Sequence, residues 1–369
     1  MKVGVDARSL LSSKPRGEGK SLLRLYREIA RLRPDWEIVF FAQGSAQSAQ
    51  SLDAIRTQIF DLPGFRLNTW ENLGLPWQAW RERLDVLHCS SSSAPRYAPV
   101  PIVMTVHDVI PLVANDGWSD AETARFAKQL RYGLSSAHSV IAVSQHTKND
   151  LLRLFQADPK KIRVVHWGID LPAPVAAGEA AGTLAGAQIR KPFVMAFGGA
   201  ARRKNTATTI AALAHAAKSR PDLQLVLIGV TGNHTRQDLA AQAAQSGLRN
   251  VIFLDYVNEA MLESIYAEAE CLVYASLYEG FGLPVLEAMS RGVAVVTSNV
   301  SSLPEVAGDA AVLVDPQDSA AIAAAVLALC NDPQLKHRLQ QQGLAQAQNF
   351  NWHATALATV EALEAAAQA

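Results

Sequence analysis

The sequence predicts an α/β protein with two doubly wound, Rossmann-like domains that face each other across a cleft. Three observations predict this class. The chain has 369 residues, which is more than a single hydrophobic core usually spans. Short apolar runs alternate with longer segments whose apolar residues recur at helical spacing, as in parallel sheets. Hydrophobic residues make up 49% of the chain, which is enough to fill two cores.

The predicted strands fall into two series. The first series reads VGVD, WEIVFFA, DVLH, IVMTVHD and SVIAVS. The second series reads FVMAFGG, LQLVLIG, NVIFLDY, ECLVYAS, VAVVTS and AAVLVD. Helical patterns such as residues 21–33 separate the strands, so we expect one parallel sheet from each series. Parallel sheets bind ligands beyond the carboxyl ends of their strands, and the chemistry is expected there.

The segment between the two series is rich in Ala, Gly and Pro, and we interpret residues 173–191 as a linker. The first domain is then residues 1–172 and the second is residues 192–349. Residues 350–369 form a strong helical pattern that must dock on one of the two domains.

Charge and cysteine content narrow the class of protein. Lys plus Arg and Asp plus Glu both number 34, which argues against a nucleic-acid-binding protein. Residues 1–175 carry 22 basic and 17 acidic side chains, a surplus that could contact the inner membrane peripherally but is usually a solvated surface. Three cysteines without metal-type spacing fit a reducing compartment. Without an apolar run of membrane-spanning length, we expect a cytoplasmic protein, at most at the cytoplasmic face of the membrane.

Residues 69–84 contain an apolar stripe at steps of three or four residues. Its members are Trp70, Leu73, Trp77, Trp80 and Leu84. Such a stripe is either a lipid-facing amphipathic helix or part of a core, and we favour the core.

Residues 276–292, SLYEGFGLPVLEAMSRG, predict a strand, a glycine turn and a helix. Gly280 and Gly282 let backbone N–H groups approach a ligand, and the helix N-terminus favours an anion such as a diphosphate. Glu279 and Glu287 would flank this ligand and accept hydrogen bonds from ribose or sugar hydroxyls. Taken alone, such a turn is structural about as often as it is functional.

Residues 193–205, FVMAFGGAARRKN, place two glycines and then Arg202, Arg203 and Lys204 after a strand. A departing nucleoside diphosphate needs a metal or fixed cations to meet its charge. The sequence has no cluster of acidic residues suited to a metal. We therefore expect no metal ion and no cofactor, with Arg203 and Lys204 neutralising the diphosphate, although an isolated triplet of this kind is more often a solvated helix start.

Two further candidates lie in the first domain. His107 follows the strand IVMTV, from where its imidazole would face the cleft, and a packed histidine is an equally good interpretation. Gly17 and Gly19 in PRGEGKS precede a helix like a phosphate-binding turn, but the segment lacks the full P-loop pattern, so ATP hydrolysis is not expected.

The combination resembles the retaining glycosyltransferases of family 4, which adopt the GT-B fold. Residues 279–316, EGFGLPVLEAMSRGVAVVTSNVSSLPEVAGDAAVLVDP, are similar to the family's EGFGLPxLEA and SSLPEVxGDAAxLVDP segments. The RKN, THD-like and VSxxTKxDL segments also match. Two motifs differ: the VxxNGxD turn has Trp167 in place of Asn, and the GxGRY turn has Lys20 and Ser21 at its end.

The resemblance implies roles for these residues. His107 would lie beside the transferred sugar, Glu279 would contact that sugar, and Arg203 with Lys204 would hold the diphosphate. Residues 350–369 would cross back to the first domain. The implied donor-binding residues are Gly17, Gly19, Gly199, Arg203, Lys204, Val257, Glu279, Gly280, Phe281, Gly282, Leu283 and Glu287.

The implied activity is metal-independent, retaining transfer of a hexose from a nucleotide diphosphate sugar to a glycan or lipid-linked acceptor in surface polysaccharide biosynthesis. GDP-mannose is the favoured donor, with UDP-glucose or a dTDP-deoxysugar as alternatives. A nucleotide-sugar epimerase would not be expected to carry the EGFGLPVLEA segment. A dinucleotide-dependent oxidoreductase is disfavoured because G-x-G-x-x-G is missing after the first strand. A catalytically silent nucleotide-binding partner protein is disfavoured because all the candidate catalytic residues are present.

Overall fold

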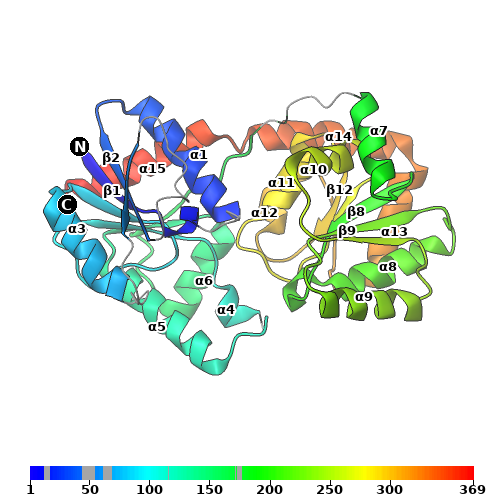
Figure 1. The fold of residues 1–369 in the computed structure, drawn as a ribbon, viewed down its shortest axis with the longest axis horizontal. Coiled ribbons are helices and arrows are strands. Elements are labelled where there is room, and N and C mark those ends of the chain that lie inside the picture. Colours follow the sequence, from blue (N-terminus) through cyan, green and yellow to red (C-terminus); the bar gives the residue numbers. More distant parts are fainter. Residues whose placement is uncertain (12–16, 44–54, 61–68, 115, 171, 173–176) are drawn as a thin grey trace. The chain divides into compact units, whose positions relative to one another are not determined.

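The computed structural model describes residues 1–11, 17–43, 55–60, 69–114, 116–170, 172 and 177–369 (Figure 1). The chain divides into two compact units. Unit 1 comprises residues 1–112, 118–168 and 350–369, and unit 2 comprises residues 113–117 and 169–349.

Unit 1 is built on a seven-stranded parallel sheet in the order β3-β2-β1-β4-β5-β6-β7. Its strands are β1 (Lys2–Asp6), β2 (Glu37–Gln43), β3 (Arg56–Phe60), β4 (Val86–Cys89), β5 (Ile102–Val106), β6 (Ser139–Ala142) and β7 (Ile162–Val164). Its helices are the 3₁₀-helix η1 (Arg8–Leu11), α1 (Gly17–Leu32), the π-helix η3 (Trp70–Gly74), α3 (Leu75–Glu82), α4 (Ile110–Val113), α5 (Asp120–Ser136), α6 (Gln145–Phe155) and α15 (Trp352–Ala367).

Unit 2 is built on a six-stranded parallel sheet in the order β10-β9-β8-β11-β12-β13. Its strands are β8 (Phe193–Phe197), β9 (Gln224–Ile228), β10 (Val251–Leu254), β11 (Leu272–Tyr274), β12 (Val295–Ser298) and β13 (Val312–Val314). Its helices are α7 (Ala177–Gly186), the 3₁₀-helix η4 (Arg202–Lys204), α8 (Thr206–Ala217), α9 (Asn233–Gln245), α10 (Glu259–Glu268), α11 (Leu283–Ser290), α12 (Leu303–Ala307), α13 (Ser319–Asn331) and α14 (Pro333–Gln348).

The structure confirms every predicted strand and the two parallel sheets. Apolar β-rich runs form these strands because both faces of each sheet are covered by helices, so side chains on either face are buried. In unit 2, α8, α9 and α13 lie on one face of the sheet, and α7, α10, α11 and α14 lie on the other (Figure 1). All five residues of β9 are buried, as expected for an interior strand of such a sheet.

The strand order fixes where a ligand can bind in each unit. In unit 1 the order reverses between β1 and β4, and in unit 2 it reverses between β8 and β11. At such a reversal the loops that leave neighbouring strands turn to opposite faces of the sheet, which opens a crevice beyond the carboxyl ends of the strands. The segments that follow β8 and β11 contain the RRK and EGFG motifs.

Part of the predicted linker is a helix. Residues 177–186 form α7, which packs on α10, with Ala180, Leu184 and the following Ile189 buried. Alanine-rich composition suits a helix as well as a linker, and these few apolar side chains are enough to dock it.

The favoured core interpretation of the stripe at residues 69–84 is wrong for three of its five members. Trp70 and Leu84 are buried, whereas Leu73, Trp77 and Trp80 are exposed to solvent. The periodicity correctly predicted a helical segment with one apolar face. It gave no information about what that face contacts, because the pattern is the same for a core and for a surface.

Among the described residues, the helices are all too short or too polar to cross a bilayer.

Candidate active site

The cationic turn after β8 is held by Asn205. Residues 202–204 form η4, and Asn205 ends it in the left-handed region at φ 54°. The Asn205 side-chain amide donates to the carbonyls of Ala275 at 2.9 Å and Pro316 at 2.6 Å, and its oxygen accepts from Thr208 Oγ1 at 2.7 Å. Asparagine tolerates this conformation better than most residues, so it can both end the turn and tie it to two neighbouring loops.

The loop after β11 is fixed to the same turn. Its Leu277 N–H donates to the carbonyl of Arg203 at 2.8 Å. The Glu279 N–H donates to Ser301 Oγ at 2.8 Å, and Ser302 Oγ donates to the carbonyls of Glu279 at 2.9 Å and Phe281 at 2.6 Å. The SSLPE segment therefore supports the EGFG bend through its serine hydroxyls.

Three donors converge on one oxygen of Glu279. Its Oε1 accepts from Arg203 Nη1, Lys204 Nζ and Tyr274 Oη, each at 2.8 Å, and Lys204 Nζ also donates to Tyr274 Oη at 2.7 Å. The side chains of Glu279, Arg203 and Lys204 are 11%, 19% and 21% exposed. We call Glu279, Arg203, Lys204 and Tyr274 the Glu279 cluster.

The pKa values of the cluster follow from burial and charge together. Burial by itself would raise the pKa of Glu279, but Lys204 and Arg203 more than offset this and lower it. Burial lowers the pKa of Lys204, although Glu279 acts in the opposite direction. Arg203 also donates from its backbone N–H to Asp116 Oδ1 at 2.9 Å.

This arrangement can bind an anion. Two cations, Arg203 and Lys204, lie beside the N-terminal end of α11. They share one oxygen of Glu279, and Arg203 Nε also pairs with Asp116 Oδ2 at 2.9 Å, so an anion that binds here competes with these two carboxylates. Gly282 begins that helix at φ 121°, where a side chain is strained, and a Cβ there would lie 2.9 Å from Leu303. Together these features favour a diphosphate held by fixed cations and backbone N–H groups.

Glu287 lies in α11 and contacts a different residue. Its Oε2 accepts from Tyr266 Oη of α10 at 3.0 Å. The structure thus gives the two predicted carboxylates separate surroundings: Glu279 is an ion-paired acceptor, and Glu287 is an acceptor at the α10–α11 contact.

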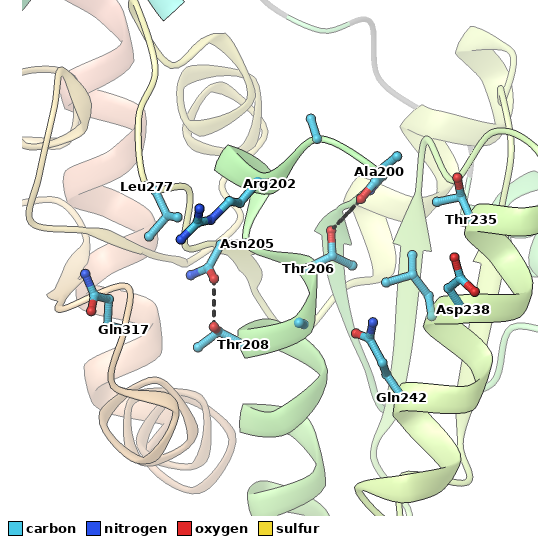
Figure 2. Close-up of a pocket in the computed structure, with 14 residues that line it drawn as sticks. Ala200, Arg202, Asn205, Thr206, Thr208, Thr235, Asp238, Gln242, Leu277 and Gln317 are labelled. Carbon is cyan, nitrogen blue, oxygen red and sulfur yellow. Dashed lines mark hydrogen bonds between the residues drawn. The ribbon is translucent and has the colours of Figure 1, made fainter. Parts of the chain in front are cut away.

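The remaining predicted donor-binding residues of unit 2 lie at the ends of its strands and helices. Leu283 opens α11, and the half-buried Val257 lies between β10 and α10. Gly199, at φ 153°, lines a pocket of about 600 Å³. Figure 2 shows this pocket beside Arg202 and Asn205, with Asp238 and Gln242 of α9 on its other side. Arg203, Lys204 and Glu279 are not among its lining residues, and we give the cluster more weight because charge is what a diphosphate needs.

In unit 1, His107 follows β5 as predicted. Its Nε2 lies 2.6 Å from the carbonyl oxygen of Ser90 and 3.3 Å from Oε1 of Glu18. A carbonyl only accepts hydrogen bonds, so Nε2 carries a proton. Burial by itself would lower the pKa of His107, but Glu18 outweighs it and raises the pKa. Trp167 stacks on the imidazole at 5.6 Å with an angle of 10° between the rings.

Gly17 and Gly19 lie in the first turn of α1. Between them, Glu18 accepts from Ser91 Oγ at 2.8 Å and pairs with His107. Their predicted approach to the diphosphate stays a prediction.

Sequence reasoning missed three residues of these clusters. Tyr274 lies in a short apolar strand, where a tyrosine looks like core. Glu18 lies between Gly17 and Gly19, whose pattern suggests a role for the backbone and not for the side chain between them. Asn205 belongs to the RKN segment, and its position just before a helix was the available signal.

Within the described ranges, the structure brings together no group of three or more His, Cys, Asp or Glu side chains that could hold a metal ion.

The fold is shared with solved glycosyltransferases. Sucrose-phosphate synthase from Thermosynechococcus elongatus aligns over 98% of this chain and 97% of its own, with a TM-score of 0.78 and 21% identity. Anabaena HepE, solved in complex with UDP and glucose, aligns over 99% and 100% with a TM-score of 0.77 and 20% identity. The two parallel-sheet units therefore have the GT-B fold.

Sequence comparison places the chain more closely. Residues 186–346 match the model of the glycosyl transferases group 1, and residues 15–172 match that of glycosyltransferase family 4. O-antigen chain mannosyltransferase B of Escherichia coli is 33% identical over 265 residues, which span 70% of this chain and 69% of that protein. The chain belongs to glycosyltransferase family 4.

Proposed function

We propose that this glycosyltransferase moves a hexose from a nucleotide diphosphate sugar, with GDP-mannose favoured, to a glycan or lipid-linked acceptor in surface polysaccharide biosynthesis at the cytoplasmic face of the membrane. The Glu279 cluster carries the proposal, because it gathers fixed cations beside the glycine bend beyond β8 and β11. The similarity to an O-antigen mannosyltransferase supports mannose as the sugar. UDP-glucose and a dTDP-deoxysugar remain the alternatives, and HepE, solved with UDP and glucose, supports UDP-glucose.

The proposed chemistry needs neither a metal ion nor a cofactor. Arg203 and Lys204 neutralise the diphosphate as the bond to the sugar breaks, and backbone groups of Gly280, Phe281 and Gly282 assist. Glu279 contacts the transferred sugar and Glu287 the ribose. The acceptor attacks from the face that the diphosphate leaves, and the diphosphate takes its proton, so the anomeric configuration is retained.

We propose that His107 acts beside the sugar as a hydrogen-bonding group. Its Nε2 carries a proton that is directed at the Ser90 carbonyl and the Glu18 carboxylate, so His107 is a poor general base at that atom. We expect it to orient the sugar.

A thermal-shift panel of GDP, UDP, dTDP and ADP tests the donor site. A ligand at a hundred times its dissociation constant adds about 2.7 kcal/mol of stability. We expect GDP to stabilise the chain most and the Lys204→Ala variant to lose that shift. A larger shift with UDP than with GDP would indicate a UDP-sugar as the donor instead of GDP-mannose. The absence of a shift with all four nucleotides would refute the donor site.

A further inference from the structure

Three exposed apolar side chains of unit 1 lie together on one helical segment. Leu73, Trp77 and Trp80 are 65%, 51% and 67% exposed and lie on η3 and α3 at steps of four and three residues. We call them the aromatic face. Side chains at such steps share one side of a helix. Burying the face in the core would have been worth about 1.5–3 kcal/mol per side chain, so leaving it in water needs a reason.

Two arginines lie beside the aromatic face. Arg81 lies over the Trp77 ring at 4.9 Å from its centre and donates to Gln58 Oε1 at 2.7 Å. Arg83, which follows α3, is exposed. Trp80, Arg81 and Arg83 line one pocket of about 460 Å³ together with Pro99 and Val100 from the loop after β4.

Glu82 of the same helix is only 12% exposed. It is ion-paired with Lys2 at 3.1 Å and with Arg81 at 3.2 Å, so Arg81 shares its charge with Glu82, whereas Arg83 has no ion pair among the described residues. The aromatic face therefore presents indole rings, a leucine and arginines. Tryptophan with arginine is the combination that prefers the boundary between acyl chains and anionic headgroups.

We propose that the aromatic face docks unit 1 on an anionic lipid surface. Leu73, Trp77 and Trp80 enter the headgroup and upper acyl region, and Arg81 and Arg83 contact lipid phosphates. The pocket beside Trp80 is where a headgroup phosphate binds. This inference does not depend on glycosyl transfer, since it rests on residues outside the Glu279 cluster and outside the surroundings of His107.

Vesicle flotation tests the proposal with the full chain. We expect binding to vesicles of phosphatidylcholine with phosphatidylglycerol, weaker binding at high salt, and little binding to phosphatidylcholine alone. The double variant Trp77→Ser, Trp80→Ser should bind these vesicles at least about tenfold more weakly than wild type. Arg83→Glu should lower binding about fivefold or more. The controls are Trp118→Ser, whose ring is 45% exposed outside this helix, and Arg125→Glu on α5.

Quenching by brominated acyl chains locates the contact. Tryptophan emission should be quenched in wild type and in Trp118→Ser, and it should be spared in the double variant. All variants should keep the wild-type melting temperature and the nucleotide-induced shift, which separates this test from that of the donor site. The proposal is overturned if wild type floats with neither vesicle. It is also overturned if the double variant floats normally, or if that variant turns a dimer into a monomer without affecting flotation, which would make the face an interface between copies.

Discussion

Replacing Glu279 by glutamine keeps the shape of the side chain and removes its charge. In the Glu279 cluster, one carboxylate oxygen accepts from Arg203, Lys204 and Tyr274 at 2.8 Å each. Losing one partner of a buried ion pair costs about 3–5 kcal/mol. Arg203 and Lys204 keep about a fifth of their surface exposed, and Arg203 keeps its pair with Asp116, so we take the lower end, about 3 kcal/mol. This corresponds to a roughly hundredfold change in an opening equilibrium.

Hydrogen exchange measured by mass spectrometry is suited to this change, because a two-unit chain need not unfold in one step. Peptides that cover η4 and β11 should exchange roughly a hundredfold faster in Glu279→Gln, and a nucleoside diphosphate should reverse most of the effect by neutralising the two cations. The matched control is Asp222→Asn, which breaks an exposed pair of the same unit with Arg220 and should leave the exchange of η4 and β11 unchanged, because exposed ion pairs contribute little. Equal protection in wild type and Glu279→Gln would refute the reasoning.

Four further outcomes are expected. Lys204→Ala and Glu287→Ala should each reduce sugar transfer to background while the circular dichroism spectrum stays unchanged; normal turnover in either would remove its role. Asn205→Ala should lower the stability of unit 2 by about 2 kcal/mol, because two carbonyls lose their donor, and unchanged exchange at η4 would contradict this. The pKa of His107 is raised above 6.5, so its contribution to folding is fully present below about pH 6.5 and is lost as pH rises through the raised value. NMR titration should show a lower His107 pKa in Glu18→Gln than in wild type. An unchanged pKa would disprove the coupling between Glu18 and His107. Full transfer in EDTA is expected, and loss that added magnesium restores would show a metal requirement.

Most of the fold could be predicted from the sequence because each long apolar run between helical patterns has one good solution, a buried parallel strand. Two strands were missed for local reasons. β7 has three residues, too few for a pattern, and β3 reads RTQIF, where polar side chains hide the strand. Short edge strands are paired on one side only, so their sequences are less constrained.

The candidate site was predictable in part. Glycines and cations at strand ends carry a physical reason in their spacing, and Arg203, Lys204 and Glu279 do lie together. Tyr274 could not be predicted in this way. Its hydroxyl has a role only because it donates to the carboxylate of Glu279, and the sequence does not show that contact. The exposure of the aromatic face to solvent could not be predicted either, because a helical period does not show whether the apolar side of the helix packs against the core or faces solvent.

The position of α15 has a consequence for how the chain is made. The helix follows unit 2 in the sequence yet belongs to unit 1, where Thr355 donates to the carbonyl of His166 at 2.8 Å and Leu363 is fully buried. During synthesis the ribosome must therefore release all of unit 2 before unit 1 can close its apolar surface. Unit 2 can mature first, and the amino-terminal half waits incomplete, exposed to chaperones and proteases for the time that some 180 residues take to emerge, roughly ten to forty seconds.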